Sequence, residues 1–296
     1  MIEPWCVLLA SREEPRQCGV RAVDRSVANA RDPLTASAHR AATVASLDRI
    51  AAVIAAPGGD RRQNFLQELG IRNLFVQPKH QGTAHEVLLA LLLLESHVAE
   101  STAVLFLPAD HIVNDEEVMT NSLLSMVEWI AEEPRPVYLL GAIPQGPHDQ
   151  LGYIVPWHGS MVMPTGVYEF VERPDVRRAR KLINEGGLWN TFIFGGTIAA
   201  LLDLYRPGFD RIISQLREAL QSDDIGTGLA RAYDGLFPLD FSRDVLEQQI
   251  DKLSVLRLLN CGWWPLKSPS LNPTSLDASA SRAGTHRNSG GHAPLE

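Results

Sequence analysis

Short apolar runs that alternate with longer stretches of helical periodicity constrain the fold of this chain most. The runs 5–10, 51–56, 74–77, 103–107 and 137–141 each have the length of one strand. The intervening segments 36–49, 61–69, 83–97 and 116–132 are each long enough for a helix that connects two strands. This alternation predicts an α/β domain of three layers, in which helices cover both faces of a mostly parallel sheet.

The pattern changes after residue 141. Segments 152–157 and 167–172 predict two strands joined by a turn, 175–186 predicts a helix rich in basic residues, and 189–195 predicts an aromatic strand. A mixed sheet is therefore expected within one domain, residues 1–267. Residues 268–296 have too few large apolar side chains to offset the entropy of ordering, so we predict a disordered tail there.

Charge and cysteine content exclude several classes of protein. The 27 Lys and Arg residues against 35 Asp and Glu give a net charge of −8, and without a basic block this argues against a nucleic-acid partner. The longest apolar run, 87–94, is far shorter than the ~20 residues that span a bilayer, so no membrane partner is expected. Cys6, Cys18 and Cys261 lack metal-ligand spacing, and the first residues lack the features of a secretory signal. We expect a reducing, cytoplasmic setting.

An apolar strand that ends in an acid is the best-marked local feature. Segment 104–111 reads VLFLPADH, so Asp110 directly follows a predicted strand. Ligands gather at the carboxyl ends of strands in open parallel sheets, where a carboxylate can hold Mg²⁺ beside phosphates. Asp110 is therefore a candidate metal ligand, although it could equally cap the turn into the next helix. We interpret His111 as structural.

A second feature is the junction between a strand and a helix at residues 77–84, which read QPKHQGTA. Thr83 is expected to be the N-cap of the helix, with Glu86 completing a capping box. Free N–H groups at the start of such a helix can face an anion or the edge of a base. Most loops between a strand and a helix have this pattern, so the segment alone is weak evidence for a binding site.

Segments 170–174 (FVERP) and 188–192 (LWNTF) place polar side chains at the end and the start of predicted strands. Glu172 and Asn190 could hydrogen-bond to sugar hydroxyls, and the Arg173 guanidinium could bind phosphate. Taken singly, Arg173 and Glu172 also fit a surface ion pair, and Asn190 fits a turn.

In this order along the chain, the segments resemble the sugar-phosphate nucleotidyltransferases, most closely the mannose-1-phosphate guanylyltransferase branch, over residues 5–269. In that family a sugar 1-phosphate attacks the α-phosphorus of a nucleoside triphosphate, and pyrophosphate leaves with Mg²⁺ bound. The resemblance therefore implies two small-molecule partners, GTP and mannose 1-phosphate, and Mg²⁺ as cofactor. It implies metal binding by Asp110, phosphate contacts by Arg16 and Arg173, nucleotide contacts by Gln77, Gly82, Thr83 and Ala84, and sugar contacts by Gly152, Glu172 and Asn190.

Two segments depart from the family pattern. The family's first strand leads into a glycine-rich loop that wraps the triphosphate, but residues 11–18 read SREEPRQC here, with Arg16 in place of a phosphate-binding lysine. Glycine lets backbone N–H groups curl around phosphate, so side chains replace such a loop poorly. In segment 262–266, Pro265 stands where the family has a second metal-binding aspartate.

Two functional interpretations follow. One is an active nucleotidyltransferase that makes GDP-mannose. The other is a non-catalytic relative that binds a sugar nucleotide or a partner subunit. In either case the chain could form a homo-oligomer or act as an accessory subunit of an intact relative. A glycosyltransferase of related fold ranks last, because residues 110–112 do not supply the Asp-x-Asp motif that such an enzyme requires.

Overall fold

The computed structural model describes residues 3–11, 33–56, 59–157 and 163–266. Within these residues, nine strands form one sheet in the order β3-β2-β1-β4-β9-β6-β10-β8-β7. The strands are β1 Trp5–Leu9, β2 Ile50–Ala55, β3 Asn73–Gln77, β4 Ala103–Pro108, β6 Val137–Ala142, β7 Tyr153–Pro156, β8 Thr165–Val171, β9 Leu188–Thr197 and β10 Leu253–Leu258. A second, two-stranded sheet pairs β5 His111–Ile112 with β11 Trp264–Pro265.

The large sheet is mixed and mostly parallel, as predicted. Strands β1 to β4 pair in parallel, and so do β6 and β10. Strand β9 is antiparallel to β4, β6 and β7, and β8 is antiparallel to β10 and β7. Only β8 and β9 of these nine described strands therefore run against the common direction.

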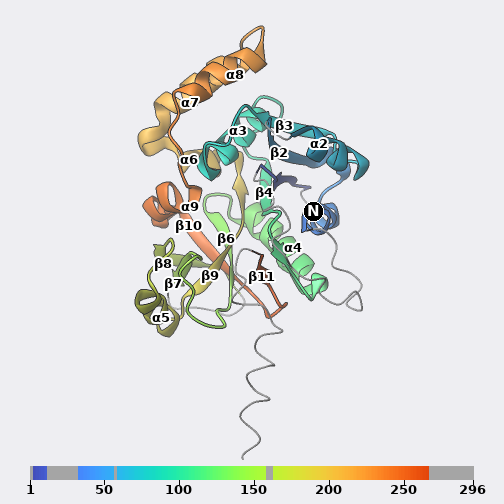
Figure 1. Cartoon of the computed structure of the whole chain (residues 1–296). Helices are drawn as coiled ribbons and strands as arrows, with labels where there is room; N and C mark the ends of the chain where they lie inside the picture. Colours follow the sequence, from blue (N-terminus) through green and yellow to red (C-terminus); the bar gives the residue numbers. More distant parts are fainter. Residues whose placement is uncertain (1–2, 12–32, 57–58, 158–162, 267–296) are drawn as a thin grey trace, which may run out of the picture.

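Helices cover both faces of the sheet, which gives the three predicted layers (Figure 1). Alternate strand residues enter two separate cores, because successive side chains of a strand point to opposite faces. One core packs α3 Thr83–Glu95, α6 Ile198–Asp203, α7 Arg206–Leu220, α8 Ile225–Asp234 and α9 Phe241–Asp244. The other packs α1 Pro33–Val44, α2 Gly59–Glu68, α4 Glu116–Glu132 and α5 Val176–Asn184.

Helix α3 is buried along nearly its whole length, as its apolar sequence predicts. Helix α4 has the predicted bounds, whereas α1 ends at Val44 instead of residue 49. Ser46 has extended backbone angles there, and a separate 3₁₀ turn, Leu47–Arg49, leads into β2. The paired helices α7 and α8 project from the domain in Figure 1, and neither of them was predicted from the sequence.

None of the described helices is long and apolar enough to cross a membrane. Cys6 and Cys261 are buried free thiols. Cys18 and the predicted tail, residues 268–296, lie outside the described residues.

Candidate functional site

The candidate residues collect at the carboxyl edge of the parallel strands. Pairing of Leu9 with Pro108 aligns the ends of β1 and β4, and Asp110 follows at that end. Pairing of Gly141 with Asn190 places the start of the antiparallel strand β9 beside the end of β6. This is the edge at which open α/β sheets bind ligands.

Gly152, Glu172 and Asn190 lie in direct contact, although they come from three different segments. The Asn190 N–H donates to the Gly152 carbonyl at 2.8 Å. A Cβ placed on Gly152 would come 2.4 Å from the Glu172 Oε2 and 3.3 Å from the Asn190 Cβ, so a larger residue would displace the Glu172 carboxylate from this contact. The structure therefore brings together the three residues that the resemblance assigned to the sugar. We call them, with Ser242, the carboxyl–amide cluster.

Ser242 completes this cluster, although no sequence motif had pointed to its segment. The Asn190 Nδ2 donates to the Ser242 Oγ at 3.2 Å, and the neighbouring Ser242 hydroxyl acts to lower the pKa of the Glu172 carboxyl. Asp240 is the N-cap of α9 and accepts from the backbone N–H groups of Ser242 and Arg243. An aspartate directly before a short polar segment is the signal that could have drawn attention to it.

Burial and neighbouring acids raise the pKa of Glu172 to about 7. The strongest cause is loss of hydration, and the carboxylates of Asp240 and Glu247 add to it. Arg173 and the Ser242 hydroxyl act in the opposite direction, but the Arg173 Nε lies 3.4 Å from the Glu172 Oε1 on a half-exposed side chain. Glu172 therefore titrates near neutral pH.

Two residues beside this cluster have left-handed backbone angles. Arg173, next to Glu172, has φ 50°, and Phe192, two residues after Asn190, has φ 61°. They are the two non-glycine residues with positive φ in the described part of the chain, and such a conformation is uncommon outside functional sites and turns. The Phe192 N–H donates to the Asn190 Oδ1 at 3.0 Å, which fixes the amide with its nitrogen toward Ser242.

The start of α3 differs from the predicted capping box. The N-cap is Gly82, with φ 89°, and Thr83 lies inside the helix. The Thr83 Oγ1 accepts from the Phe241 N–H at 2.8 Å, and the Ala84 N–H donates to the Leu239 carbonyl at 3.1 Å. The predicted capping box is therefore wrong, because the segment before α9 folds back onto this turn and takes the Thr83 Oγ1 and the Ala84 N–H.

Glu86, the other half of the predicted box, instead reaches the end of β1. Its Oε1 accepts from the Ser11 N–H at 3.3 Å, and both residues are buried. A carboxylate therefore binds the second backbone N–H after β1, in the segment where the family that the sequence resembles is expected to have its glycine-rich loop. Arg16, which lies in that segment, is outside the described residues.

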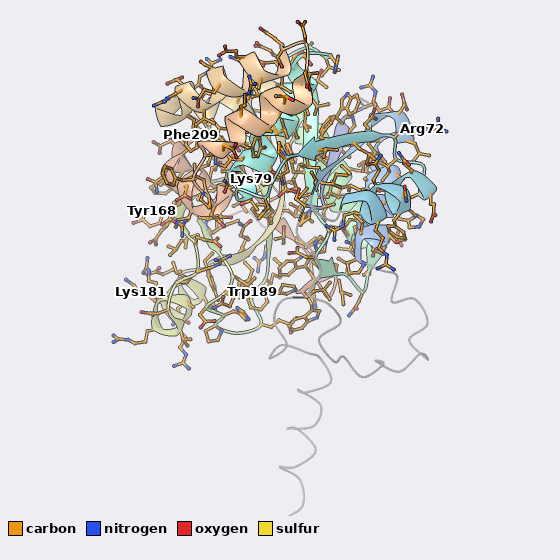
Figure 2. The ribbon with its side chains drawn as sticks, turned by 45° about the horizontal axis from the view of Figure 1, so that its top comes forward. Arg72, Lys79, Tyr168, Lys181, Trp189 and Phe209 are labelled. Atoms are coloured by element: carbon orange, nitrogen blue, oxygen red, sulfur yellow. The ribbon has the colours of Figure 1, made fainter. Side chains whose placement is uncertain are left out.

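Gln77, at the end of β3, is fully buried, and its amide nitrogen and oxygen have no hydrogen-bond partner among the described residues. A buried amide without partners is costly, so its donor and acceptor are suited to the polar edge of a ligand. Lys79, two residues after Gln77 and labelled in Figure 2, forms an ion pair at 3.0 Å with Asp234, the last residue of α8.

Asp110 is half-buried and lies beside β11. The Leu266 N–H donates to the Asp110 carbonyl at 2.9 Å, and Pro265 pairs with His111. The alternative role of Asp110 as a helix cap is wrong, because Asp115 is the N-cap of α4 and accepts from the Val118 N–H. Because Leu266 bonds to Asp110 and Pro265 pairs with His111, the segment with Pro265 lies beside Asp110.

His111 is a structural residue, in agreement with its interpretation from the sequence. An Arg40 nitrogen lies 2.9 Å from its Nε2, and because arginine only donates, this imidazole nitrogen accepts. Burial and the Arg40 charge lower the pKa of His111 to about 3, so it is neutral. Arg40 also donates to both carboxylate oxygens of Glu116, at 2.7 and 2.8 Å.

The described residues contain no group of three or more His, Cys, Asp or Glu side chains placed to hold a metal ion. Pro265 offers no side-chain donor beside Asp110. This donor set fits a Mg²⁺ ion that is held mainly by phosphates and waters, with Asp110 as a single protein ligand, and it does not fit a metal cage built by the protein.

The sequence model of the nucleotidyl transferase family matches residues 31–227. The chain belongs to the nucleotidyl transferase family. The match runs from α1 to the start of α8, so it includes Asp110, Gly152, Glu172 and Asn190 but not β1, Ser242 or Pro265. Individual relatives also support the resemblance to the sugar-phosphate nucleotidyltransferases that the sequence motifs indicated.

Alginate biosynthesis protein AlgA of Pseudomonas fluorescens is 30% identical over 132 residues, which are 43% of this chain and 26% of that protein. A mannose-1-phosphate guanylyltransferase of Salmonella muenchen is 31% identical over 124 residues, 41% of this chain and 26% of the relative. The aligned part thus spans about a quarter of the length of these curated relatives.

A crystal structure described as a mannose-1-phosphate geranyltransferase from Thermus thermophilus superposes with a TM-score of 0.72. It is 25% identical to this nucleotidyl transferase and covers 89% of this chain and 76% of the other. A mannose-6-phosphate isomerase structure from Helicobacter pylori, 16% identical with TM-score 0.68, covers 89% of this chain and 100% of its own, and it shows the shared fold alone.

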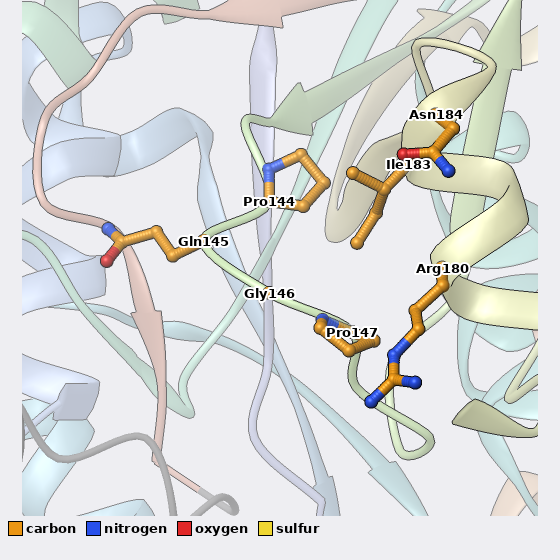
Figure 3. Close-up of a pocket in the computed structure, with 7 residues that line it drawn as sticks. All are labelled: Pro144, Gln145, Gly146, Pro147, Arg180, Ile183 and Asn184. Atoms are coloured by element: carbon orange, nitrogen blue, oxygen red, sulfur yellow. The ribbon is translucent and has the colours of Figure 1, made fainter. Parts of the chain in front are cut away.

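A surface cavity of about 330 Å³ lies between the loop after β6 and helix α5 (Figure 3). Pro144, Gln145, Gly146 and Pro147 line one side, and Arg180, Ile183 and Asn184 line the other. None of the candidate site residues lines it, so this cavity is separate from the carboxyl–amide cluster.

Proposed function

We propose that this nucleotidyl transferase transfers a guanylyl group from GTP to mannose 1-phosphate and releases pyrophosphate. The observation that carries the proposal is the contact of Gly152, Glu172 and Asn190 at the carboxyl edge of the sheet. This cluster offers carboxylate and amide groups to sugar hydroxyls. The mannose-1-phosphate guanylyltransferase of Salmonella muenchen, 31% identical over 124 residues, supports GTP and mannose 1-phosphate as the substrates.

The roles of the residues follow from charge and position. Glu172 and Asn190 bind the sugar, and Gly152 leaves room for them. Gln77 offers its unpartnered amide to the base, and the turn at Gly82, Thr83 and Ala84 supports the nucleotide. The two substrates carry phosphates that repel each other, so Arg173 and Arg16 supply positive charge that holds them for in-line attack. Bound Mg²⁺, with Asp110 as ligand, would neutralise charge on the triphosphate.

The decisive experiment measures pyrophosphate release from GTP and mannose 1-phosphate with Mg²⁺, for the wild type and for Asp110→Ala. We expect a loss of at least about 100-fold in kcat for the variant, because it removes a charge-stabilising ligand of the transition state. Asp251→Ala is the matched control, since Asp251 is an exposed acid in the 3₁₀ turn Ile250–Lys252. Turnover that does not depend on Asp110 would contradict its assigned role.

A second function, sugar-nucleotide binding without catalysis, is favoured by the pairing of Pro265 beside Asp110 and by the bond from Ser11 to Glu86. Both observations leave fewer groups for the triphosphate. Such a chain would act as a homo-oligomer or as an accessory subunit of an intact relative. Titration with GDP-mannose and with GTP tests this: a ligand that binds only the folded state raises the melting temperature. Stabilisation by GDP-mannose without turnover would favour the binding function.

A further inference from the structure

The cavity between the loop after β6 and helix α5 combines one cationic side chain with apolar walls. In Figure 3 the Arg180 side chain extends from α5 toward Pro147 on the loop. The Ile183 side chain points across the cavity toward Pro144, and Asn184 adds an amide. The volume of about 330 Å³ lies at the lower end of the range of ligand pockets, about 300–1,000 Å³. The cavity therefore fits a small molecule with one polar and one apolar side.

Arg180 is available to a ligand. Among the described residues it has no hydrogen bond or ion pair, whereas Arg178 pairs with Glu169, and Lys181 pairs with Glu185 at 3.6 Å. The sequence of α5, VRRARKLIN, has four cationic side chains and no acid, so the charge around Arg180 favours an anion. A guanidinium binds phosphate or carboxylate oxygens through two parallel N–H donors. The polar side of the ligand is thus expected to be an anionic group.

Both walls of the cavity continue into the carboxyl–amide cluster. Helix α5 lies between Glu172 and Asn190 in the chain, so the two ends of this helix lead to two residues of the cluster. The loop that carries Pro147 leads to Gly152 at the start of β7. A ligand that bridges the loop and the helix therefore restrains all three segments that build the cluster.

The Tyr153 hydroxyl joins the two walls behind the cavity. It accepts from the His148 N–H at 2.8 Å and from the Trp189 Nε1 at 3.0 Å. His148 directly follows Pro147 on the loop, and Trp189 directly precedes Asn190. Hydrogen bonds thus connect a wall of the cavity to the neighbour of a cluster residue, in addition to the continuity of the chain.

We propose that this cavity is a second ligand site, which binds a small organic anion and whose occupancy changes the affinity of the carboxyl–amide cluster for its own ligand. The phosphate or carboxylate group of the anion lies at Arg180, and its apolar body lies against Pro144, Pro147 and Ile183. Binding in the cavity is independent of the proposed function, and only the choice of mannose 1-phosphate as the ligand of the cluster rests on it.

Calorimetry and NMR on the full chain test the binding. Phenyl phosphate and benzoate are the probes, because they present the same apolar ring with the two kinds of anionic group. Phenol and inorganic phosphate are the separate halves. We expect the better of the two probes to bind at least about 10-fold more tightly than either half, and the better probe identifies the anionic group. It should shift the NMR signals of the Ile183 methyl groups and the Asn184 side-chain amide.

Arg180→Gln removes the cationic group and should weaken binding of the better probe at least about 10-fold. Arg177→Gln is the matched control, because Arg177 is exposed on the same helix and does not line the cavity, and its variant should lose less than about 2-fold. Unfolding curves establish that both variants fold. Equal weakening in the two variants, or probe-induced shifts that spare Ile183 and Asn184, overturns the site.

The coupling is measured by titrating mannose 1-phosphate with and without saturating probe. We expect at least about a 5-fold change in its Kd, and the same factor in the Kd of the probe when the order is reversed, because linkage is reciprocal. Arg180→Gln should abolish the effect of the probe and leave mannose 1-phosphate binding by itself unchanged. An unchanged Kd in the wild type overturns the coupling. If the wild type does not bind mannose 1-phosphate at all, the proposed function fails instead, and probe-induced shifts of the Gly152 and Asn190 signals decide the coupling.

Discussion

The two ends of the candidate site differ in how completely they are built. In the carboxyl–amide cluster, the Asn190 amide donates to Ser242 and accepts from the Phe192 N–H. Gly152 has no side chain, so Glu172 and Asn190 can both lie against it. At the phosphate end, a buried glutamate already takes the Ser11 N–H, and Pro265 stands beside Asp110 without a side-chain donor. The groups proposed to bind a sugar and those proposed to neutralise phosphates therefore come from separate segments, and one set can be depleted while the other stays intact.

The turn at Gly82 lies between these two ends, so its disruption should have the largest effect. A Cβ on Gly82 would lie 2.0 Å from the Leu239 carbonyl oxygen, at φ 89°. We expect Gly82→Ala to lower the free energy of unfolding by about 3–4 kcal/mol, since the clash is with backbone and adds to the strain of a positive φ. Chemical denaturation measures this.

Gly186→Ala is the control that separates strain from clash. Gly186 has φ 84° with nothing within 4 Å of an added Cβ, so its variant should lose only about 1–2 kcal/mol. If Gly82→Ala and Gly186→Ala lose the same free energy of unfolding, the close contact between Gly82 and Leu239 does not contribute to stability.

Gly152→Ala should damage the carboxyl–amide cluster selectively. The added methyl would displace the Glu172 Oε2, which lies 2.4 Å from its position, and would press on Asn190. We expect about 30-fold weaker binding of mannose 1-phosphate and a loss of stability of about 1–3 kcal/mol. Gly146→Ala, with nothing within 4 Å, is the matched control and should change stability by less than about 0.5 kcal/mol. Unchanged sugar binding in Gly152→Ala would remove the cluster from the site.

The sequence predicted the layers and most of the strands because buried strands and an all-apolar helix such as 83–95 leave strong patterns. It also predicted that Gly152, Glu172 and Asn190 belong together, through motif order. It could not predict that Phe241 bonds to Thr83 across 158 residues of sequence, because this contact depends on tertiary packing. The same contact explains the wrong capping box: tertiary partners took the groups that a local rule had assigned within α3.

The pH dependence of stability should distinguish the two ends further. The pKa of Glu172 is raised to about 7 from an ordinary 4.5, so the folded state binds more protons than the unfolded state between these values. Its contribution to the free energy of unfolding is therefore lost as pH rises from about 4.5 to about 7. From this group the wild type should lose roughly 2–3 kcal/mol of unfolding free energy over this pH range, and Glu172→Gln should not show this loss. Urea denaturation at several pH values measures the difference. The exposed Glu68→Gln should leave the wild-type slope unchanged, and a similar slope in Glu172→Gln would contradict the assigned environment.

The smallest expected effect is a gain at the phosphate end. Pro265 pairs with His111, and the Leu266 N–H bonds the Asp110 carbonyl, so residue 265 sits beside the segment of Asp110. Pro265→Asp adds a carboxylate there, and we expect Mg²⁺-dependent pyrophosphate release to rise by about 10-fold, because two acids hold Mg²⁺ better than one. Pro265→Asn separates charge from the loss of proline. If Pro265→Asn raises pyrophosphate release as much as Pro265→Asp does, a missing acid does not limit the activity. A gain that is confined to Pro265→Asp and abolished by Asp110→Ala shows that a missing acid does limit it.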